Sequence, residues 1–368
     1  MSIDIGIIGL PQSGKTTIFN GLTKGKADIK GFIPKGSAPH LGTASVPEPR
    51  LDMLASMLNP KKVVHAEAKY IDIGASVKEL AQETGIGGQL LNQLSTVDAL
   101  INVVRAFKDD RIPRIEGSLD IERDIAAMNL ELIFSDLAII ERRLARIAIS
   151  LKGAQQAERQ AASHEQALLI KLKAVLENNA PIRELALTPD ESKSIANYQF
   201  LTAKPLLIAV NIGEEQLPEA ASLEESLNSQ YSQPNCRVIT LCAKLETELT
   251  QLDNSSAKEF QAEFSITEPG LERIIRLSYE LLGLVTFFTT ASDELKAWPI
   301  KKNTGALKAA GKIHSDIERG FIRAEVISYD DLLKCGSISE ARKQGLLRLE
   351  GKSYTVQDGD VITFLFNV

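Results

Sequence analysis

The feature that most constrains this chain is a glycine-rich stretch near its start, Gly9–Thr16, which reads GLPQSGKT and has the spacing G-x-x-x-x-G-K-[ST]. It follows an apolar run, Ile3–Ile8, that predicts a strand, and it leads into Lys15–Thr23, which predicts a helix. In that context the backbone N–H groups of the turn and the helix N-terminus can surround phosphate oxygens. The sequence therefore predicts a P-loop within an α/β domain that binds a nucleotide.

Size and composition narrow the remaining possibilities. The 368 residues suggest two or three domains, and 44% hydrophobic with 24% charged residues is typical of a globular protein. The net charge of −6 argues against bulk coating of nucleic acid but leaves room for a local basic patch. The three cysteines have no paired spacing, which is typical of a protein in a reducing compartment. We find no signal peptide and no apolar run of about 18 residues that could span a membrane. We therefore expect a cytoplasmic protein without membrane contact. We also expect a monomer.

Four further apolar runs predict the strands of the sheet domain. They are short, bounded and almost continuously hydrophobic, as are strands buried on both faces of a parallel sheet. The runs are Ala68–Ile73, Ala99–Val104, Leu206–Val210 and Val238–Leu241. Together with the first strand they predict an α/β sheet of the P-loop class.

A helical hairpin is predicted within residues 121–199. Its first helix carries an apolar seam with the 4-3-4-3-4 spacing of a coiled coil, at Ile133, Leu137, Ile140, Leu144, Ile147 and Leu151. After a polar turn expected at Gly153–Ser163, a second apolar stripe follows at Leu169, Leu172 and Leu176. The capping box Thr188–Glu191, with proline at the first helical position, predicts another helix that leads back to the sheet.

The pattern of apolar residues changes near Gly283: after this residue, short strand-like runs alternate with turns. These runs predict a small β-rich domain: Val285–Phe288, Ile322–Val326, Ser353–Val356 and Val361–Val368. The expected domains are a nucleotide-binding domain of residues 1–120 and 200–283, a coiled-coil arm of residues 121–199, and a β-domain of residues 284–368.

A run of lysines accompanies Trp298 in the β-domain, at Lys301, Lys302, Lys308 and Lys312. Such lysines are either a solvated surface around a half-buried tryptophan or a contact for RNA or a partner protein. The sequence leaves both interpretations open.

Histidines provide no further site. The four of them, His40, His65, His164 and His314, lack the spacing of metal ligands and fall in no Ser-His-Asp or Cys-His arrangement. We interpret them as ordinary surface or hydrogen-bonded residues.

The P-loop and the loops that end the strands predict the nucleotide contacts. Lys15 is expected to reach the β- and γ-phosphates and the Thr16 hydroxyl to bind Mg²⁺, which makes these two the candidate catalytic residues. Asp72 ends the second strand, where a carboxylate can hold Mg²⁺ through water or simply form a turn. Loops at the carboxyl ends of parallel strands bind ligands. The remaining candidate nucleotide contacts are Gln12, Ser13, Gly14, Thr17, Asn211, Glu214, Cys242 and Ala243.

At the level of whole segments the chain resembles the YchF/Obg-like ATPase family of P-loop proteins. The matching segments are Gly9–Thr23, Val46–Leu51, Tyr70–Ile73, Gly85–Gln89, Val97–Arg105, Phe200–Pro205 and, most specifically, Ala297–Asp360. The resemblance implies that the hairpin is an inserted coiled-coil arm and that the β-domain is a TGS domain with the ubiquitin-like β-grasp fold. It also implies nucleotide-dependent association with the ribosome or ribosomal RNA.

The loop expected to contact the purine favours ATP. GTPases use N-K-x-D, whose aspartate accepts hydrogen bonds from guanine N1–H and N2–H₂, whereas this chain has Asn211-Ile212-Gly213-Glu214. In similar proteins the N-x-x-E loop accompanies a preference for ATP. The expected cofactors are therefore ATP and Mg²⁺, with GTP as the alternative nucleotide.

Departures from the family pattern predict slow hydrolysis. Ser76 stands where other GTPases place a water-orienting glutamine, and Gly36 where relatives offer a threonine to Mg²⁺. Glu79 and Arg114 also differ from the residues that the family has at the aligned positions. We expect a slow ATPase switch; the alternatives are a nucleotide-binding module with little hydrolysis and a GTP-preferring member. A small-molecule kinase is disfavoured because the additional residues form an arm and a β-domain.

Overall fold

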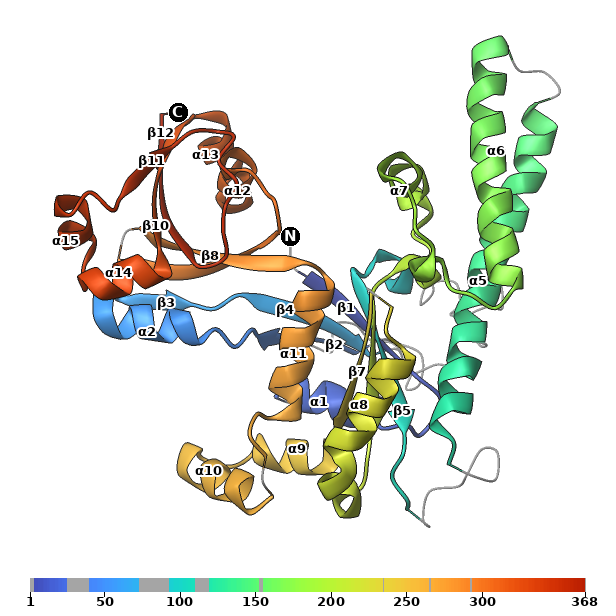
Figure 1. The fold of residues 1–368 in the computed structure, drawn as a ribbon, viewed down its shortest axis with the longest axis horizontal. Helices are drawn as coiled ribbons and strands as arrows, with labels where there is room; N and C mark the ends of the chain where they lie inside the picture. Colours follow the sequence, from blue (N-terminus) through green and yellow to red (C-terminus); the bar gives the residue numbers. More distant parts are fainter. Residues whose placement is uncertain are drawn as a thin grey trace, which may run out of the picture. The chain divides into compact units, whose positions relative to one another are not determined.

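The computed structural model describes residues 3–24, 40–72, 93–109, 119–151, 155–233, 235–264, 266–291 and 293–367. The chain divides into two compact units, whose elements are drawn in Figure 1. The smaller unit comprises Met1–Ile3, Ala44–Ala68 and Ile275–Val368, and the larger comprises Asp4–Thr43 and Lys69–Ile274. Across these described ranges, no helix combines the length and the apolar character needed to cross a membrane.

A six-stranded sheet of order β2-β4-β1-β5-β6-β7 runs through the larger unit. Its strands are β1 (Ile3–Ile8), β2 (His40–Ser45), β4 (Glu67–Asp72), β5 (Ala99–Arg105), β6 (Leu206–Asn211) and β7 (Cys236–Leu241). Strands β1, β5, β6 and β7 pair in parallel. All five strands expected from the apolar runs are present, so the predicted fold class is confirmed; β2 was not predicted.

The hydrophobic core explains why the apolar runs become strands. Every residue of β5 and β6 is buried, which requires cover on both faces of the sheet. Ile125, Met128 and Leu132, from the first half of a long helix, belong to the same buried cluster. The larger unit also contains α1 (Lys15–Thr23), α8 (Ala220–Gln230), α9 (Ala243–Leu249), α10 (Asn254–Glu263) and the first residues of α11 (Gly270–Leu281).

The predicted hairpin is formed by α5 (Ile121–Ser150) and α6 (Gln156–Glu177), which lie side by side in Figure 1. Its seam packs as expected, because Ile133, Ile140, Ile147, Leu169, Leu172 and Leu176 share one buried cluster. The turn predicted at Gly153–Ser163 is wrong in extent, since α6 already begins at Gln156. The Gln155 N–H donates to the Glu158 carboxylate at 3.2 Å, and the Gln, Ala and Glu residues that follow favour a helix.

The capping box predicted after the hairpin is confirmed. Helix α7 (Pro189–Ile195) begins after Thr188, whose hydroxyl accepts from the Glu191 N–H at 3.2 Å. The Glu191 carboxylate in turn accepts from the Thr188 N–H at 2.9 Å. Two backbone N–H groups at the start of this helix are therefore satisfied.

A buried polar network fixes the base of the arm to the chain that returns to β6. The Asp136 carboxylate on α5 accepts from the backbone N–H of Leu201 at 2.9 Å, from that of Thr202 at 2.8 Å and from the Thr202 hydroxyl at 2.6 Å. The Arg183 guanidinium donates to the carbonyl oxygens of Thr202 and Lys204. Asp136 is completely buried, so these bonds replace all contact with water.

The smaller unit contains a second six-stranded sheet, of order β11-β10-β12-β8-β9-β3. Its C-terminal elements are β8 (Leu284–Ala291), β9 (Glu294–Lys301), α12 (Ala306–Ile313), α13 (Ser315–Arg319), β10 (Phe321–Ser328), α14 (Tyr329–Cys335), α15 (Ile338–Lys343), β11 (Arg348–Glu350) and β12 (Asp360–Phe366). The strand predicted at Ser353–Val356 is wrong: this segment makes only an isolated bridge, between Gly305 and Thr355. The Tyr354 carbonyl accepts instead from the Ala306 N–H at 2.7 Å, at the start of α12.

The cation that contacts Trp298 is not a member of the lysine run. This half-buried tryptophan on β9 stacks on Phe287 with 6.5 Å between the ring centroids. The ammonium over its ring, 4.0 Å from the centroid, belongs to Lys296, which is outside the run. Lys308 pairs with Glu318 at 2.7 Å. An RNA contact by this run stays a prediction.

Residues 44–68 pack with the C-terminal strands, which the sequence did not indicate. This segment contains α2 (Pro49–Leu58) and β3 (Lys62–Val64), and β3 pairs in parallel with β9. Arg50 on α2 donates to Glu48 at 2.7 Å and to Asp358 at 2.8 Å, and its guanidinium lies 5.7 Å from the centre of the Phe288 ring. The expected domain boundaries remain a proposal. Within that proposal, the contacts of residues 44–68 assign this segment to the β-domain.

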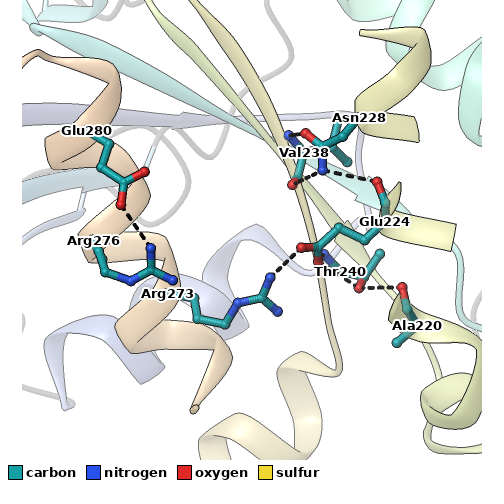
Figure 2. A network of polar contacts seen from close by, with 8 residues as sticks. All are labelled: Ala220, Glu224, Asn228, Val238, Thr240, Arg273, Arg276 and Glu280. Carbon is teal, nitrogen blue, oxygen red and sulfur yellow. Dashed lines mark hydrogen bonds and ion pairs between the residues drawn. The ribbon is translucent and has the colours of Figure 1, made fainter. Parts of the chain in front are cut away.

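The outer edge of β7 is closed by side chains of α8 (Figure 2). Asn228 accepts from the Val238 N–H and donates to the Val238 carbonyl, both at 2.9 Å, and Glu224 accepts from the Thr240 N–H at 2.7 Å. Arg273 of α11 forms an ion pair with the same Glu224. The unpaired backbone groups of an edge strand can pair with another chain. At β7, which leads to Cys242, the bonds to Asn228 and Glu224 occupy these groups.

Candidate nucleotide-binding site

The glycine-rich turn adopts the backbone conformation that a phosphate loop needs. Gln12 and Gly14 have φ values of 61° and 98°, in the left-handed region. A Cβ atom on Gly14 would lie 2.2 Å from the Asn211 side-chain nitrogen, so only glycine fits at this point. The turn thereby comes close to the end of β6.

Lys15 begins α1 and its ammonium lies over the loop. The Nζ atom donates to the carbonyl oxygens of Gly9 at 2.8 Å and Leu10 at 2.9 Å, and the residue is only 8% exposed. Burial lowers the Lys15 pKa, and the nearby carboxylates of Asp72 and Glu131 oppose this shift. The site therefore concentrates one cation in a shielded position, where its charge interacts strongly with phosphate.

Thr16, in the first turn of α1, and Asp72, at the end of β4, meet and form the candidate cation site. The Thr16 hydroxyl donates to Asp72 Oδ2 at 2.8 Å, and Asp72 is only 1% exposed. Asp72 Oδ1 is buried and has no hydrogen-bond partner among the residues that the structure describes. A buried carboxylate oxygen beside a hydroxyl fits Mg²⁺, which prefers oxygen ligands and keeps several waters. The described ranges contain no cluster of three His, Cys, Asp or Glu side chains suited to a metal, so such a cation would have few protein ligands here.

Asn211 joins the phosphate loop to the loop after β7. Its side-chain nitrogen donates to the Ser13 carbonyl at 3.0 Å, and its side-chain oxygen accepts from the Ala243 N–H at 3.1 Å. The residue is 5% exposed, so both bonds are shielded from water. One amide thus fixes two of the loops that the sequence assigned to the nucleotide.

The segment after β6 places Ile212 and Glu214 in different environments. Ile212 is 1% exposed and belongs to the hydrophobic core, whereas Glu214 is exposed and pairs with Lys244 at 2.7 Å. Next to this pair, burial raises the pKa of the Cys242 thiol, which is therefore an inert neutral group at neutral pH.

The structure brings most of the candidate residues together and leaves others untested. Contacts join Thr16 to Asp72, and Asn211 to Ser13 and Ala243. Gln12 and Thr17 are exposed on the loop and the first turn of α1. The departures at Gly36, Ser76, Glu79 and Arg114 lie outside the described residues.

Sequence reasoning missed His40 as a neighbour of this site. We interpreted it as an ordinary surface residue, yet its Nδ1 lies 3.8 Å from Asp72 Oδ2. The contact depends on the position of β2 in the sheet, and β2 itself was not predicted. No spacing in the sequence signals it.

Comparison with known proteins gives matches over the whole chain. The chain is 40% identical over 370 residues to the Bacillus subtilis protein named "Ribosome-binding ATPase YchF", and 37% identical over 368 residues to the protein of that name from Escherichia coli O157:H7. Both alignments cover 100% of each chain. The solved structure of the Schizosaccharomyces pombe YchF GTPase is similar, with a TM-score of 0.83 and 30% identity over 99% of this chain and 98% of that one. A family model, YchF-GTPase_C, described as "Protein of unknown function (DUF933)", matches residues 284–367.

Proposed function

This chain belongs to the YchF family, and from that premise we propose that it is an ATPase that associates with the ribosome. The observation that carries the proposal is the convergence of Lys15, Thr16 and Asp72 at one end of the sheet, while Asn211 holds the phosphate loop through the Ser13 carbonyl. A protein that works on ribosomes would act in the cytoplasm, and we propose that location.

The chemistry follows from the positions of these side chains. Lys15 would place its ammonium against the β- and γ-phosphates, where it stabilises the charge that develops during phosphoryl transfer. The Thr16 hydroxyl and Asp72 Oδ1, which has no partner in the described part of the chain, would hold Mg²⁺, which when bound neutralises charge on the same phosphates. Asn211 would hold the phosphate loop at a fixed position relative to the loop at Ala243, and this second loop would lie next to the purine.

We propose ATP as the preferred nucleotide. Glu214 stands where guanine recognition uses aspartate, and it is engaged by Lys244 at 2.7 Å. Its side chain is longer by one methylene than the aspartate that pairs with guanine. Ile212, which stands at the lysine position of the GTPase loop, is buried in the core, so that position offers no cation to a purine.

Glu214→Asp should move the preference towards GTP. The unmodified protein should bind ATP at least about tenfold more tightly than GTP, a difference of about 1.4 kcal/mol, and the substitution should reduce this ratio. Calorimetric titration with both nucleotides measures the two affinities. Glu219→Asp, an exposed position further along the same segment, is the matched control and should leave the ratio unchanged. A parent protein that prefers GTP tenfold would contradict the adenine proposal.

Hydrolysis by the protein alone should be slow, because Ser76 stands at the position where other GTPases have the water-orienting glutamine. We expect turnover below about 1 s⁻¹, under the usual range of phosphoryl-transfer enzymes such as kinases. Phosphate release should be measured with and without purified ribosomes, together with co-sedimentation in the presence of ATP, of ADP and without nucleotide. If the protein co-sediments with ribosomes equally under all three nucleotide conditions, it would be a simple binding module. If it does not co-sediment under any of them, the proposed association is contradicted.

A further inference from the structure

His40 begins β2 and lies beside the candidate cation site. Its Nδ1 is 3.8 Å from Asp72 Oδ2, the oxygen that also accepts from the Thr16 hydroxyl. The imidazole is half exposed, and its ring centroid lies 6.1 Å from that of Phe19 on α1. Three separate elements, α1, β2 and β4, therefore each bring to this point one side chain of a type that can bind a metal.

The position of His40 is a consequence of how β2 packs. Residues two apart in a strand face the same side, so Gly42 faces α1 as His40 does. A Cβ atom on Gly42 would lie 2.4 Å from a methyl carbon of Thr23 and 3.2 Å from the Phe19 ring, so the glycine allows β2 to lie directly against α1. This close approach holds His40 over the beginning of the helix, near Thr16.

The donor atoms available here differ from those of a site built for Mg²⁺ alone. Asp72 Oδ1 is buried without a partner among the described residues, the Thr16 oxygen is adjacent, and His40 adds an imidazole nitrogen. His40 Nδ1 lies 3.8 Å from Oδ2, the other oxygen of the same carboxylate. Two donors each about 2.1 Å from one ion can be up to about 4.2 Å apart, so the imidazole and the Asp72 carboxylate are close enough to share an ion. Imidazole suits first-row transition metals, whereas Mg²⁺ favours oxygen.

We propose that His40 is an additional ligand for the nucleotide-bound cation and that it makes the site favour a first-row transition-metal dication over Mg²⁺. The inference rests on the proposed nucleotide site at Thr16 and Asp72. It concerns only the identity of the cation, so ATP binding with Mg²⁺ is required by the proposed function and does not depend on His40.

The test uses Co²⁺ and Mg²⁺ as probes, with the full chain and a non-hydrolysable ATP analogue. The parent should bind Co²⁺ at least about tenfold more tightly than Mg²⁺. His40→Ala should weaken Co²⁺ binding about tenfold while changing Mg²⁺ affinity less than about twofold. The visible absorption of bound Co²⁺ should also shift, because one nitrogen ligand is lost. His164→Ala, at an exposed position on α6, is the control and should change neither affinity nor spectrum.

The outcomes separate this inference from the proposed function. If the analogue binds with Mg²⁺ but His40→Ala changes neither Co²⁺ affinity nor its spectrum, the ligand role of His40 is refuted and the nucleotide site stands. Equal changes for both cations would also refute it, since they would show a general electrostatic effect on Asp72. If the parent does not bind the analogue with either cation, the proposed function itself fails.

Discussion

Lys15→Ala is expected to abolish high-affinity binding of nucleoside triphosphates. The ammonium is the side-chain cation of the phosphate loop, it is 8% exposed, and its present partners are two backbone carbonyls of that loop. Charge-assisted hydrogen bonds contribute about 1.5–3 kcal/mol each, so losing contacts with two phosphates should weaken ATP binding about 10²-fold or more. Calorimetric titration of ATP in the presence of Mg²⁺ measures the effect.

The control for Lys15→Ala must separate charge from general damage. Lys171→Ala removes a lysine of the arm that pairs with Glu191 at 2.7 Å, and it should leave ATP affinity unchanged. Circular dichroism of both variants should match the parent, since the Lys15 side chain contributes little apolar area to the core. Unchanged ATP affinity in folded Lys15→Ala would show that the triphosphate does not bind at this loop.

The parts of the fold that follow from local pattern were predictable. The strands β1, β5, β6 and β7 are short runs of apolar residues that are buried on both faces of the sheet. Each such run can be predicted from its own residues, without knowledge of its partners. The P-loop is also local, because glycine at position 14 and the start of α1 lie within a few residues of each other. The capping box at Thr188 belongs to the same class of signal.

Features that depend on distant pairing could not be predicted. Strand β9 contains Pro299 and two lysines, and it becomes a strand because β8 pairs with its whole length. The segment 353–356 has strand-like composition, yet its Tyr354 carbonyl is used at the start of α12. Both outcomes are decided by partners remote in the sequence, which composition does not reveal.

The candidate site shows the same division. Lys15 and Thr16 are set by the motif, and Asp72 by its place at the end of a strand. The double role of Asn211, bonded to Ser13 and to Ala243, requires two loops that are far apart in the chain. The approach of His40 requires Gly42 to bring an unpredicted edge strand against α1.

Asp136→Ala should cause the largest loss of stability among single substitutions in the arm. The carboxylate is completely buried and accepts three hydrogen bonds, two of them from backbone N–H groups of Leu201 and Thr202. Alanine would leave those N–H groups without partners, at a cost of about 1–3 kcal/mol each. We expect a loss of about 3 kcal/mol or more in the free energy of unfolding, measured by urea denaturation without nucleotide. Glu141→Ala on the same helix removes only a surface pair with Lys173 and should cost less than about 1 kcal/mol.

The pH dependence of this loss gives the substitution a second, independent readout. Burial raises the Asp136 pKa to about 6, although hydrogen bonds from Thr202 and Leu201 and the charge of Arg183 oppose the shift. Because the folded pKa lies above the unfolded value of 3.8, the folded state binds the proton more tightly. The resulting stabilisation is complete below about pH 4 and disappears as the pH rises through 6. The destabilisation caused by Asp136→Ala should therefore be larger at pH 5 than at pH 7.5, by about 1.4 kcal/mol. A loss that grows instead towards pH 7.5 would mean that the ionised carboxylate is the form that the folded arm prefers.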